Sequence, residues 1–152
     1  MAMINITLPD GTVNEYVSGI TCAEVVTDAL GRKHGCLAAR VDGVEKDMSH
    51  QLVESCSVEG ILSSSDEGMY ILRHSTAHLL AQAVIELYPD AKPTIGPPID
   101  RGFYYDFAME PITEADLKPI QKKMQELARK NFTLERIELN DQELQDHFRN
   151  NP

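Results

Sequence analysis

The residues best suited to chemistry are two histidines, His74 and His78, which lie four positions apart in Arg73-His-Ser-Thr-Ala-His-Leu-Leu80. In a helix this spacing puts both imidazoles on one face, about 40° apart. Histidine changes charge near neutral pH, so such a pair can act as acid and base around a substrate. The pair could also share a metal ion or fill a polar place in the interior. Ser75 stands where a metalloprotease helix carries glutamate, and the spacing alone leaves all three uses open.

A second candidate element is the loop of residues 94–99, Thr-Ile-Gly-Pro-Pro-Ile, which leads into a run of aromatic residues. Gly96 permits a close backbone approach to a ligand. In a strand that starts at position 103, Tyr105 shares one face with two phenylalanines, whereas Tyr104 and Asp106 share the other. The run is either an ordinary core strand or one side of a polar cleft beside the histidines, lined by a tyrosine hydroxyl and loop amides.

Basic side chains gather on a helix that we expect to start near position 117. They are Lys118, Lys122, Lys123, Arg129 and Lys130. Glu126 and Lys130 form a favourable i,i+4 pair on it. A solvated helix face is the default interpretation of this pattern, and contact with an RNA backbone is the alternative.

The helix that positions the histidines is predicted over residues 67–88 and ends at Pro89. We expect it to have two distinct faces. The predicted core face consists of Leu72, Thr76, Leu79 and Ala83. The predicted histidine face continues through Ala81 and Ile85.

The first sixty residues carry the signals of a small sheet folded around one helix. Residues 4–8 alternate apolar and polar, a Pro-Asp-Gly turn follows, and residues 12–17 return as the second strand of a β-hairpin. Thr21 and Glu24 form the Thr-x-x-Glu capping box of a helix that should stop at Gly31.

A second extended pair follows that helix. Residues 37–41 lead into an Asp-Gly turn and a return strand from position 44, and residues 60–62 form a last short strand. Strand, strand, helix and further strands in this order predict a β-grasp arrangement.

Residues 63–66, Ser-Ser-Ser-Asp, are polar and unpatterned, so we place a linker there. This divides an α+β chain into a β-grasp domain over 1–64 and a second domain over 65–152. In the second domain Asp116, rather than Thr113, should cap a helix, because Pro119 then falls in the first turn.

The chain's last segment is predicted as a strand over residues 132–139 followed by a short helix that begins at Asn140. The chain stops just after that helix begins. We therefore expect the second domain to be incomplete and the chain to be part of a longer protein.

Composition excludes several classes. The 152 residues are 42% hydrophobic, which suits one or two globular domains. A net charge of −10 does not support a general electrostatic grip on nucleic acid. Without a signal peptide or an apolar run of about 20 residues, we expect a cytoplasmic protein with no membrane contact. Cys22, Cys36 and Cys56 form no CxxC motif, so reduced thiols are favoured over a metal site.

Three motifs in order resemble the N-terminal region of bacterial threonyl-tRNA synthetase. They are Ile4-Asn-Ile-Thr-Leu-Pro-Asp-Gly11, the histidine motif from Arg73 to Leu80, and Ile95-Gly-Pro-Pro-Ile-Asp-x-Gly-Phe-Tyr-Tyr-Asp106. The resemblance runs from about residue 3 to the end. It implies that the β-grasp module is a TGS domain and that the second domain is the first part of the family's α/β editing domain, with its histidine-bearing helix.

The resemblance also implies a function. The family joins threonine to tRNA(Thr) with ATP, and its editing domain hydrolyses seryl-tRNA made in error. His74, His78 and Tyr105 match editing-site residues, and Gly96 and Asp106 are expected to contact the substrate. The implied partners are the tRNA acceptor end and the rest of a homodimeric synthetase. ATP, Mg²⁺ and a catalytic-core zinc belong to that parent, with no cofactor or metal expected in this chain.

One departure from the family pattern bears on activity. A Cys-x-x-x-His pair and a lysine complete the family's editing site, but Glu143 stands four residues before His147 here. We therefore expect the chain alone to be nearly inactive. The alternatives are a non-catalytic TGS module that binds RNA or protein, and a metal-dependent hydrolase that uses the two histidines as ligands.

Overall fold

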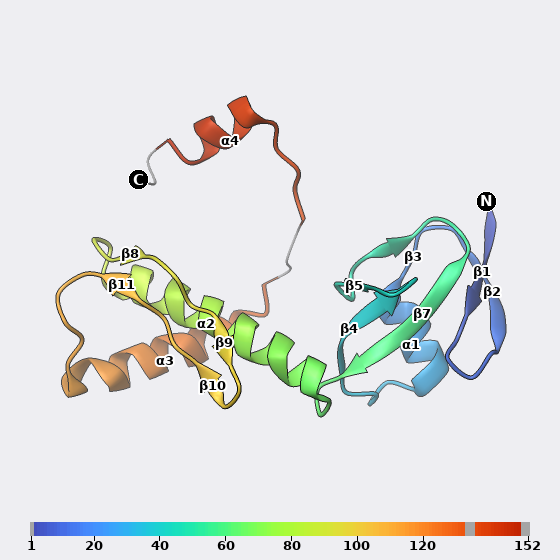
Figure 1. The fold of residues 1–152 in the computed structure, drawn as a ribbon, viewed down its shortest axis with the longest axis horizontal. Helices are drawn as coiled ribbons and strands as arrows, with labels where there is room; N and C mark the ends of the chain where they lie inside the picture. Colours follow the sequence, from blue (N-terminus) through green and yellow to red (C-terminus); the bar gives the residue numbers. More distant parts are fainter. Residues whose placement is uncertain (1, 133–135, 150–152) are drawn as a thin grey trace.

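The computed structural model describes residues 2–132 and 136–149 (Figure 1). Its first part is a five-stranded sheet, in the order β2-β1-β7-β4-β5, with one helix packed on it. β1 and β7 are parallel, and the other neighbours are antiparallel. The bounds are β1 Met3–Thr7, β2 Val13–Val17, β3 Ile20–Thr21, α1 Cys22–Leu30, β4 Cys36–Val41, β5 Val44–Lys46, β6 Gln51–Leu52 and β7 Cys56–Leu62. This mixed sheet around a helix confirms the predicted β-grasp arrangement.

Alternation along the strands builds the core of this sheet. In β1, Ile4 and Ile6 are buried while their neighbours face solvent. From α1, Val25 and Val26 pack against them, together with Val58 of β7. Each aliphatic side chain buried in this way contributes about 1.5–3 kcal/mol of transfer free energy. Cys22 is also buried, which raises the pKa of its thiol to about 11, and all three cysteines are free thiols.

Local turn and cap signals gave correct predictions in this region. In the first hairpin, the Asp10 carboxylate accepts a hydrogen bond from the Thr12 N–H at 2.9 Å. In the second, Asp42 and Gly43 both have positive φ, 46° and 82°, as a tight two-residue hairpin turn requires. The Thr21–Glu24 capping box is present at the start of α1.

The last strand was predicted too short. β7 begins at Cys56, not at residue 60, and it lies in the middle of the sheet between β1 and β4. Its first half alternates with Ser57 and Glu59, which is the pattern of a strand with one covered face. This half forms a strand because β1 and β4 lie on either side of β7 in the sheet. Both partners come from distant parts of the sequence.

The predicted linker is a tightly bonded turn, and Asp66 is already the first residue of α2 (Asp66–Leu87). The Ser65 hydroxyl caps the helix by accepting from the Gly68 N–H at 3.0 Å, and it donates to the Leu62 carbonyl at 2.7 Å. A Cβ added at Gly68 would lie 1.9 Å from that carbonyl oxygen, so only glycine fits there. The connection between β7 and α2 is therefore a tight, hydrogen-bonded turn.

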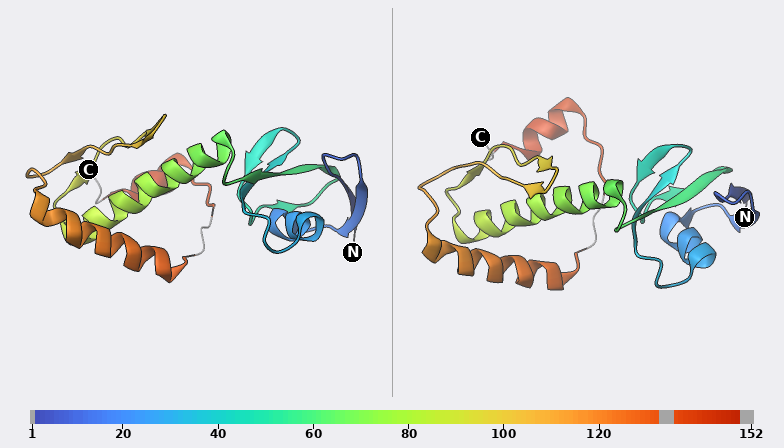
Figure 2. Two further views of the ribbon diagram at one scale, coloured as in Figure 1. Left: turned by 90° about the horizontal axis from the view of Figure 1, so that it is seen from below. Right: turned by 60° about the horizontal axis from the view of Figure 1, so that its bottom comes forward.

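The second part of the chain is organised around α2. Both views in Figure 2 show α3 (Glu114–Lys130) on one side of α2 and the short hairpin of β9 (Pro98–Ile99) and β10 (Gly102–Phe103) on another. β8 (Lys92–Pro93) pairs with β11 (Phe107–Ala108). The small core between these elements contains Val84, Ala91 and Ile120, with Leu80, Leu87, Tyr88, Phe107, Met109 and Met124 packed around them.

The predicted faces of the histidine helix were partly wrong. Ala83 is buried on the predicted core face and Ile85 is exposed on the predicted histidine face, as expected. Leu72, assigned to the core face, is however 42% exposed, and Ala81, assigned to the histidine face, is buried. The reason is that α2 is contacted from more than one side, so its buried positions do not form a single stripe. Small alanines at these positions allow the close approach.

Two further predictions need correction. Thr113, not Asp116, is the N-cap of α3, and Pro119 lies one turn further inside the helix than expected. The aromatic run is not one strand, because residues 104–106 separate β10 from β11. No helix in the described residues combines the length and the apolar character that a membrane crossing requires.

The final segment differs from its prediction as well. Positions 132 and 136–139 are not in a strand, and the rest of the predicted strand, 133–135, lies outside the described residues. The helix expected from Asn140 is present as α4 (Asp141–His147), with Asn140 as its N-cap. Figure 1 shows α4 apart from the packed elements, and none of its residues is buried.

Candidate functional site

The histidine pair lies on an exposed part of α2. The two Nε2 atoms of His74 and His78 are 2.8 Å apart, and the ring centroids are separated by 4.7 Å with a 48° tilt. A hydrogen bond between two imidazole nitrogens needs one N–H donor and one bare nitrogen. At least one ring must therefore be neutral, and the pair can pass a single proton between its members while keeping the contact.

The surroundings of the pair are aromatic and open. Tyr70, one turn earlier, places its ring 6.4 Å from the His74 ring, and its side chain is more than half exposed. On the neighbouring position, Arg73 reaches the Ile99 carbonyl with its Nη1 at 3.5 Å, at the outer limit of a hydrogen bond. This contact connects the hairpin of β9 and β10 to the helix that carries the histidines.

The loop residues singled out from the sequence lie together. Gly96 sits against the Tyr105 ring so closely that a Cβ at Gly96 would be 2.0 Å from a ring carbon. Tyr105 in turn stacks on Phe107, with centroids 4.7 Å apart and planes within 22°. The two arms of the loop are joined by backbone bonds, because the Asp106 N–H donates to the Ile95 carbonyl at 2.8 Å and the Thr94 N–H donates to the Asp106 carbonyl at 3.0 Å.

These residues form two separate groups. His74 and His78 make one, and Gly96 and Tyr105 make the other. Within residues 2–132 and 136–149, no hydrogen bond joins the side chain of Tyr105 or Asp106 to either imidazole. The hairpin that contacts α2 belongs to the same loop as Tyr105, so the second group borders the helix. The exposed Asp106 side chain faces solvent.

The donor set around the histidines does not describe a metal centre. In the part of the chain that the structure describes, no group of three histidine, cysteine, aspartate or glutamate side chains is placed to hold an ion. A catalytic zinc normally takes three protein ligands. The prediction that this chain holds no metal stays open to direct measurement.

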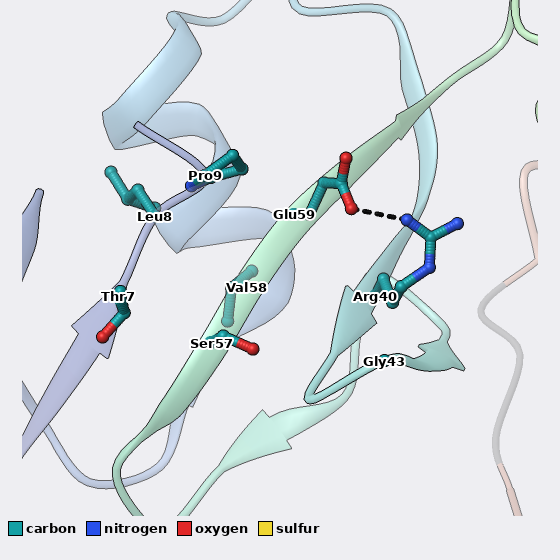
Figure 3. Close-up of a pocket in the computed structure, with 8 residues that line it drawn as sticks. All are labelled: Thr7, Leu8, Pro9, Arg40, Gly43, Ser57, Val58 and Glu59. Atoms are coloured by element: carbon teal, nitrogen blue, oxygen red, sulfur yellow. Dashed lines mark hydrogen bonds and ion pairs between the residues drawn. The ribbon is translucent and has the colours of Figure 1, made fainter. Parts of the chain in front are cut away.

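A charged cluster that the sequence analysis missed lies at the junction of the sheet and α2. Arg40 of β4 pairs with Glu59 of β7 at 2.5 Å and also with Glu67, in the first turn of α2. Arg40 and Glu59 border a hollow of about 240 Å³ that Leu8 and Pro9 also line. Figure 3 shows these side chains and the contact between Arg40 and Glu59. Arg40 and Glu59 are direct partners in the β4–β7 register, so predicting that pairing would have revealed the cluster.

The charges of this cluster perturb one another. The hydrogen bond from Arg40 lowers the pKa of Glu67, whereas contact with Glu67 raises the pKa of Glu45. The Arg40 guanidinium is thus shared between the sheet and the helix, and it offsets the repulsion among three nearby carboxylates.

A second bonded junction connects α2 to α3. The Tyr88 hydroxyl, at the end of α2, donates to the Asp116 carboxylate at 2.7 Å. The same carboxylate accepts from the hydroxyl and the N–H of Thr113 at 2.6 and 2.8 Å. The hydrogen bonds from Thr113 and Tyr88 lower the pKa of Asp116 to about 2.

Comparison with known proteins gives the class of the first part. Residues 4–61 match the TGS domain family. Over 133 residues, 86% of this chain, the sequence is 48% identical to a threonine–tRNA ligase of Alkalilimnicola ehrlichii. It is 45% identical over 149 residues, 97% of the chain, to that of Burkholderia multivorans, and 42% identical over 151 residues, also 97%, to that of Desulforamulus reducens. The chain spans 21–24% of the length of these relatives.

The β-grasp sheet and the matched residues together define a TGS domain. The match extends beyond that domain, through the histidine helix and the loop that borders it. Over nearly all of its length the chain corresponds to the N-terminal, TGS-containing region of bacterial threonine–tRNA ligases.

Proposed function

We propose that this chain is the TGS domain and the first part of the editing domain of a threonine–tRNA ligase, and that α2 supplies one wall of a site that hydrolyses seryl-tRNA(Thr). The observation that carries the proposal is the exposed imidazole pair, with 2.8 Å between the two Nε2 atoms. The similarity to threonine–tRNA ligases supports it, because that similarity covers the helix and the loop beside it.

The chemistry expected of the wall is proton transfer in ester hydrolysis. His74 would position the attacking water or polarise the terminal ribose hydroxyl, and His78 would accept or return the proton across the Nε2 contact. Tyr105, held between Gly96 and Phe107, would contribute a hydroxyl at the border of the cleft. Asp106 would contact the substrate from the exposed side of the loop.

A second, hydrolytic site is needed because the synthetic site has limited selectivity for threonine over serine. Serine is smaller than threonine by one methyl and carries the same hydroxyl. A difference of this size in a pocket changes binding by only about 1–3 kcal/mol. A synthetic site selective for threonine therefore cannot exclude serine by size, and the wrong product must be removed afterwards.

The remaining activities of the proposed parent lie outside this chain. Aminoacylation with ATP and Mg²⁺, a catalytic-core zinc, the anticodon contacts and a homodimer are all assigned to the rest of the synthetase. The editing wall opposite the histidines, with its cysteine, histidine and lysine, is assigned there too. The 152-residue chain alone is accordingly expected to hydrolyse seryl-tRNA very poorly, because misplaced groups cost about 100-fold in rate.

The test is a chimaera in which this chain replaces the matching quarter of the Burkholderia multivorans ligase. Hydrolysis of seryl-tRNA(Thr) and threonylation are measured on the same preparation. We expect His74→Ala to slow hydrolysis by about 100-fold or more and to leave threonylation largely unchanged. His50→Ala, on the TGS domain, is the matched control. Equal hydrolysis rates in the two variants would contradict the assignment.

The metal-dependent alternative has its own measurement. Elemental analysis of the purified chain after mild dialysis should give well below one equivalent of zinc, since the described residues place only two ligands together and a catalytic zinc normally takes three. One tightly held equivalent, lost in His78→Ala, would favour a metallohydrolase instead.

A further inference from the structure

We propose that the TGS domain binds an extended peptide segment of another protein, which adds a strand to a free edge of β7. β1 pairs with β7 only at Cys56 and Ser57, whereas β4 pairs with it from Val58 to Leu62. Within residues 2–132 and 136–149, the register places no strand on the β1 side of β7 beyond Ser57. We call this free edge, residues 58–62, the β7 notch.

The backbone of the notch has hydrogen-bonding groups that an added strand can use. The Asp42 N–H donates to the Ser57 carbonyl at 3.1 Å, so Ser57 directs its backbone groups toward the β4 side. These groups alternate in direction along an antiparallel strand. The N–H and the carbonyl of Gly60, three residues further on, therefore face the side that β1 has left. An extended peptide lying there would pair with both, which is the hydrogen bonding of β-strand addition.

A hollow flanks the notch on each face of the sheet. The hollow on the α1 face has a volume of about 290 Å³ and is lined in part by Val26, Ala29 and Leu30. The hollow on the outer face is the one of about 240 Å³ beside Arg40, whose residues are drawn in Figure 3. The two hollows meet where β1 leaves β7, because they share four lining residues: Leu8, Pro9, Val58 and Glu59.

The two hollows define the side-chain pattern of the peptide. Successive side chains of a strand point to opposite faces of a sheet, so one would enter the α1 hollow and its neighbours would lie at the outer one. Leu30 is 58% exposed in the free chain, and an aliphatic side chain in the α1 hollow would cover it. A volume of about 290 Å³ is at the lower limit of small-molecule pockets, which suits a side chain better than a cofactor.

The charges around the notch favour basic residues beside that aliphatic one. On the outer face, the Arg40 guanidinium is shared by Glu59 and Glu67, and Glu45 contacts Glu67. Three carboxylates around one guanidinium leave an excess of negative charge. Asp10 adds a further carboxylate to the lining of the α1 hollow. The occupant that fits is therefore an extended segment in which lysine or arginine alternates with isoleucine, leucine or valine.

Other occupants fit the notch less well. Residues 1–65 carry nine acidic and four basic side chains, which disfavours nucleic acid. A second copy of this chain could present its edge strands β2 or β5, but neither has a net positive charge. In the part of the chain that the structure describes, α2 and the elements after it contribute no residue to either hollow. The proposal is independent of the editing assignment, because it involves neither the imidazoles nor tRNA.

The probe for the experiment is the fluorescein-labelled peptide Ser-Lys-Ile-Lys-Val-Lys-Ser, titrated with the whole chain and followed by fluorescence anisotropy. Two backbone-methylated forms test for an added strand. One carries N-methyl groups on isoleucine and valine, and the other carries them on the two lysines that flank isoleucine. Because N–H groups alternate in direction along a strand, one form should bind like the unmodified peptide and the other at least about tenfold more weakly. Equal binding by the two forms would overturn the proposal.

Variants of the chain test the α1 hollow. Leu30→Ser should raise the Kd of the peptide at least about tenfold, the effect of losing one buried aliphatic contact. Val53→Ser is the matched control, because Val53 is 66% exposed and lines neither hollow. Circular dichroism confirms that both variants fold. The same Kd for the two variants would show that the peptide does not use this hollow.

Further outcomes would also overturn the proposal. One is the absence of saturable binding up to about 1 mM chain. Another is equally tight binding of a peptide with glutamate in place of each lysine. Binding that competes with dimerisation in sedimentation equilibrium would assign the notch to a second copy instead. Loss of peptide binding in the chimaera with the Burkholderia multivorans ligase would show that the rest of the enzyme covers the notch.

Discussion

Gly96 and Tyr105 are in such close contact that no side chain fits between the loop backbone and the ring. The ring cannot easily move away, because it stacks on Phe107 on the way into β11. The absence of a side chain at Gly96 therefore determines the shape of the loop that borders the histidine helix.

Gly96→Ala should therefore destabilise the chain by about 1–3 kcal/mol, the usual cost of overfilling a packed contact. Urea denaturation gives the free energy of unfolding, and the proton shifts of the Phe107 ring report on the stack. In a Tyr105→Ala background the same substitution should cost much less. An equal cost in both backgrounds would mean that the ring is not what excludes the methyl group.

Asp116 provides a residue-scale prediction about pH. Its pKa is about 2 in the folded chain, below the ordinary value of 3.8. A depressed folded pKa adds stability that is present above the unfolded value and is lost as pH falls through the folded one. The stability advantage of the wild type over Asp116→Asn should thus be full above about pH 4 and should shrink toward pH 2.

The measurement combines urea midpoints at several pH values with an NMR titration of the Asp116 carboxyl carbon. Tyr88→Phe is the matched variant, because it removes one of the hydrogen bonds that lower the pKa. The carboxyl should titrate at a higher pH in that variant. A titration midpoint near 4 in the wild type would show that the hydrogen bonds to Asp116 are not formed in solution.

Helix α1 begins at a capping box formed by Thr21 and Glu24. The Thr21 hydroxyl accepts from the Glu24 N–H at 3.3 Å, and the Glu24 carboxylate accepts from the Thr21 N–H at 2.8 Å. Hydrogen bonding from Thr21 also lowers the pKa of Glu24.

Thr21→Ala should lower the free energy of unfolding by about 0.5–2 kcal/mol, the usual loss for an N-cap. Thr27→Ala, inside the same helix, is the control and should be close to neutral, because alanine is the better helix former. Chemical denaturation of both variants measures this effect. An unchanged denaturation midpoint for Thr21→Ala would show that the cap does not contribute to stability.

Elements with signals inside a few neighbouring residues could be predicted from the sequence. The Asp42-Gly43 turn, the α1 cap and the start of α4 are of this kind. β7 and the burial of α2 could not be predicted as well, since both depend on which distant elements pack against them. The same division holds at the candidate site, where the spacing of His74 and His78 predicted their shared face. Neither the Gly96–Tyr105 contact nor the role of Arg40 is visible in local spacing.

At the scale of the whole molecule, each part has its own core. The TGS core around Ile6 and Val25 shares no residue with the core around Val84 and Ile120. Residues 1–65 should therefore fold alone, with a cooperative melt and dispersed amide signals in an NMR spectrum. A collapsed, poorly dispersed spectrum would place the domain boundary elsewhere.

The Arg40 cluster should control how the two parts are oriented rather than how stable they are. Ion pairs with this exposure add little to the free energy of unfolding, but Arg40 connects both β7 and the first turn of α2. Arg40→Met should leave the melting temperature nearly unchanged while amide relaxation shows the two parts tumbling more independently. Arg32→Met is the control. Identical relaxation in both variants would show that Arg40 does not hold the joint.

The turn between β7 and α2 makes the helix a lever arm. His78 is twelve residues beyond Asp66, about 18 Å along the axis, so a tilt of about 10° at the turn would sweep its imidazole through about 3 Å. Rates of hydrolysis respond to misplacements of about 1 Å. Gly68, packed against the Leu62 carbonyl, lies on the same helix as the imidazoles, six residues before His74 and ten before His78. It helps to fix the direction of α2, so a side chain at this position would tilt the helix and displace the imidazoles.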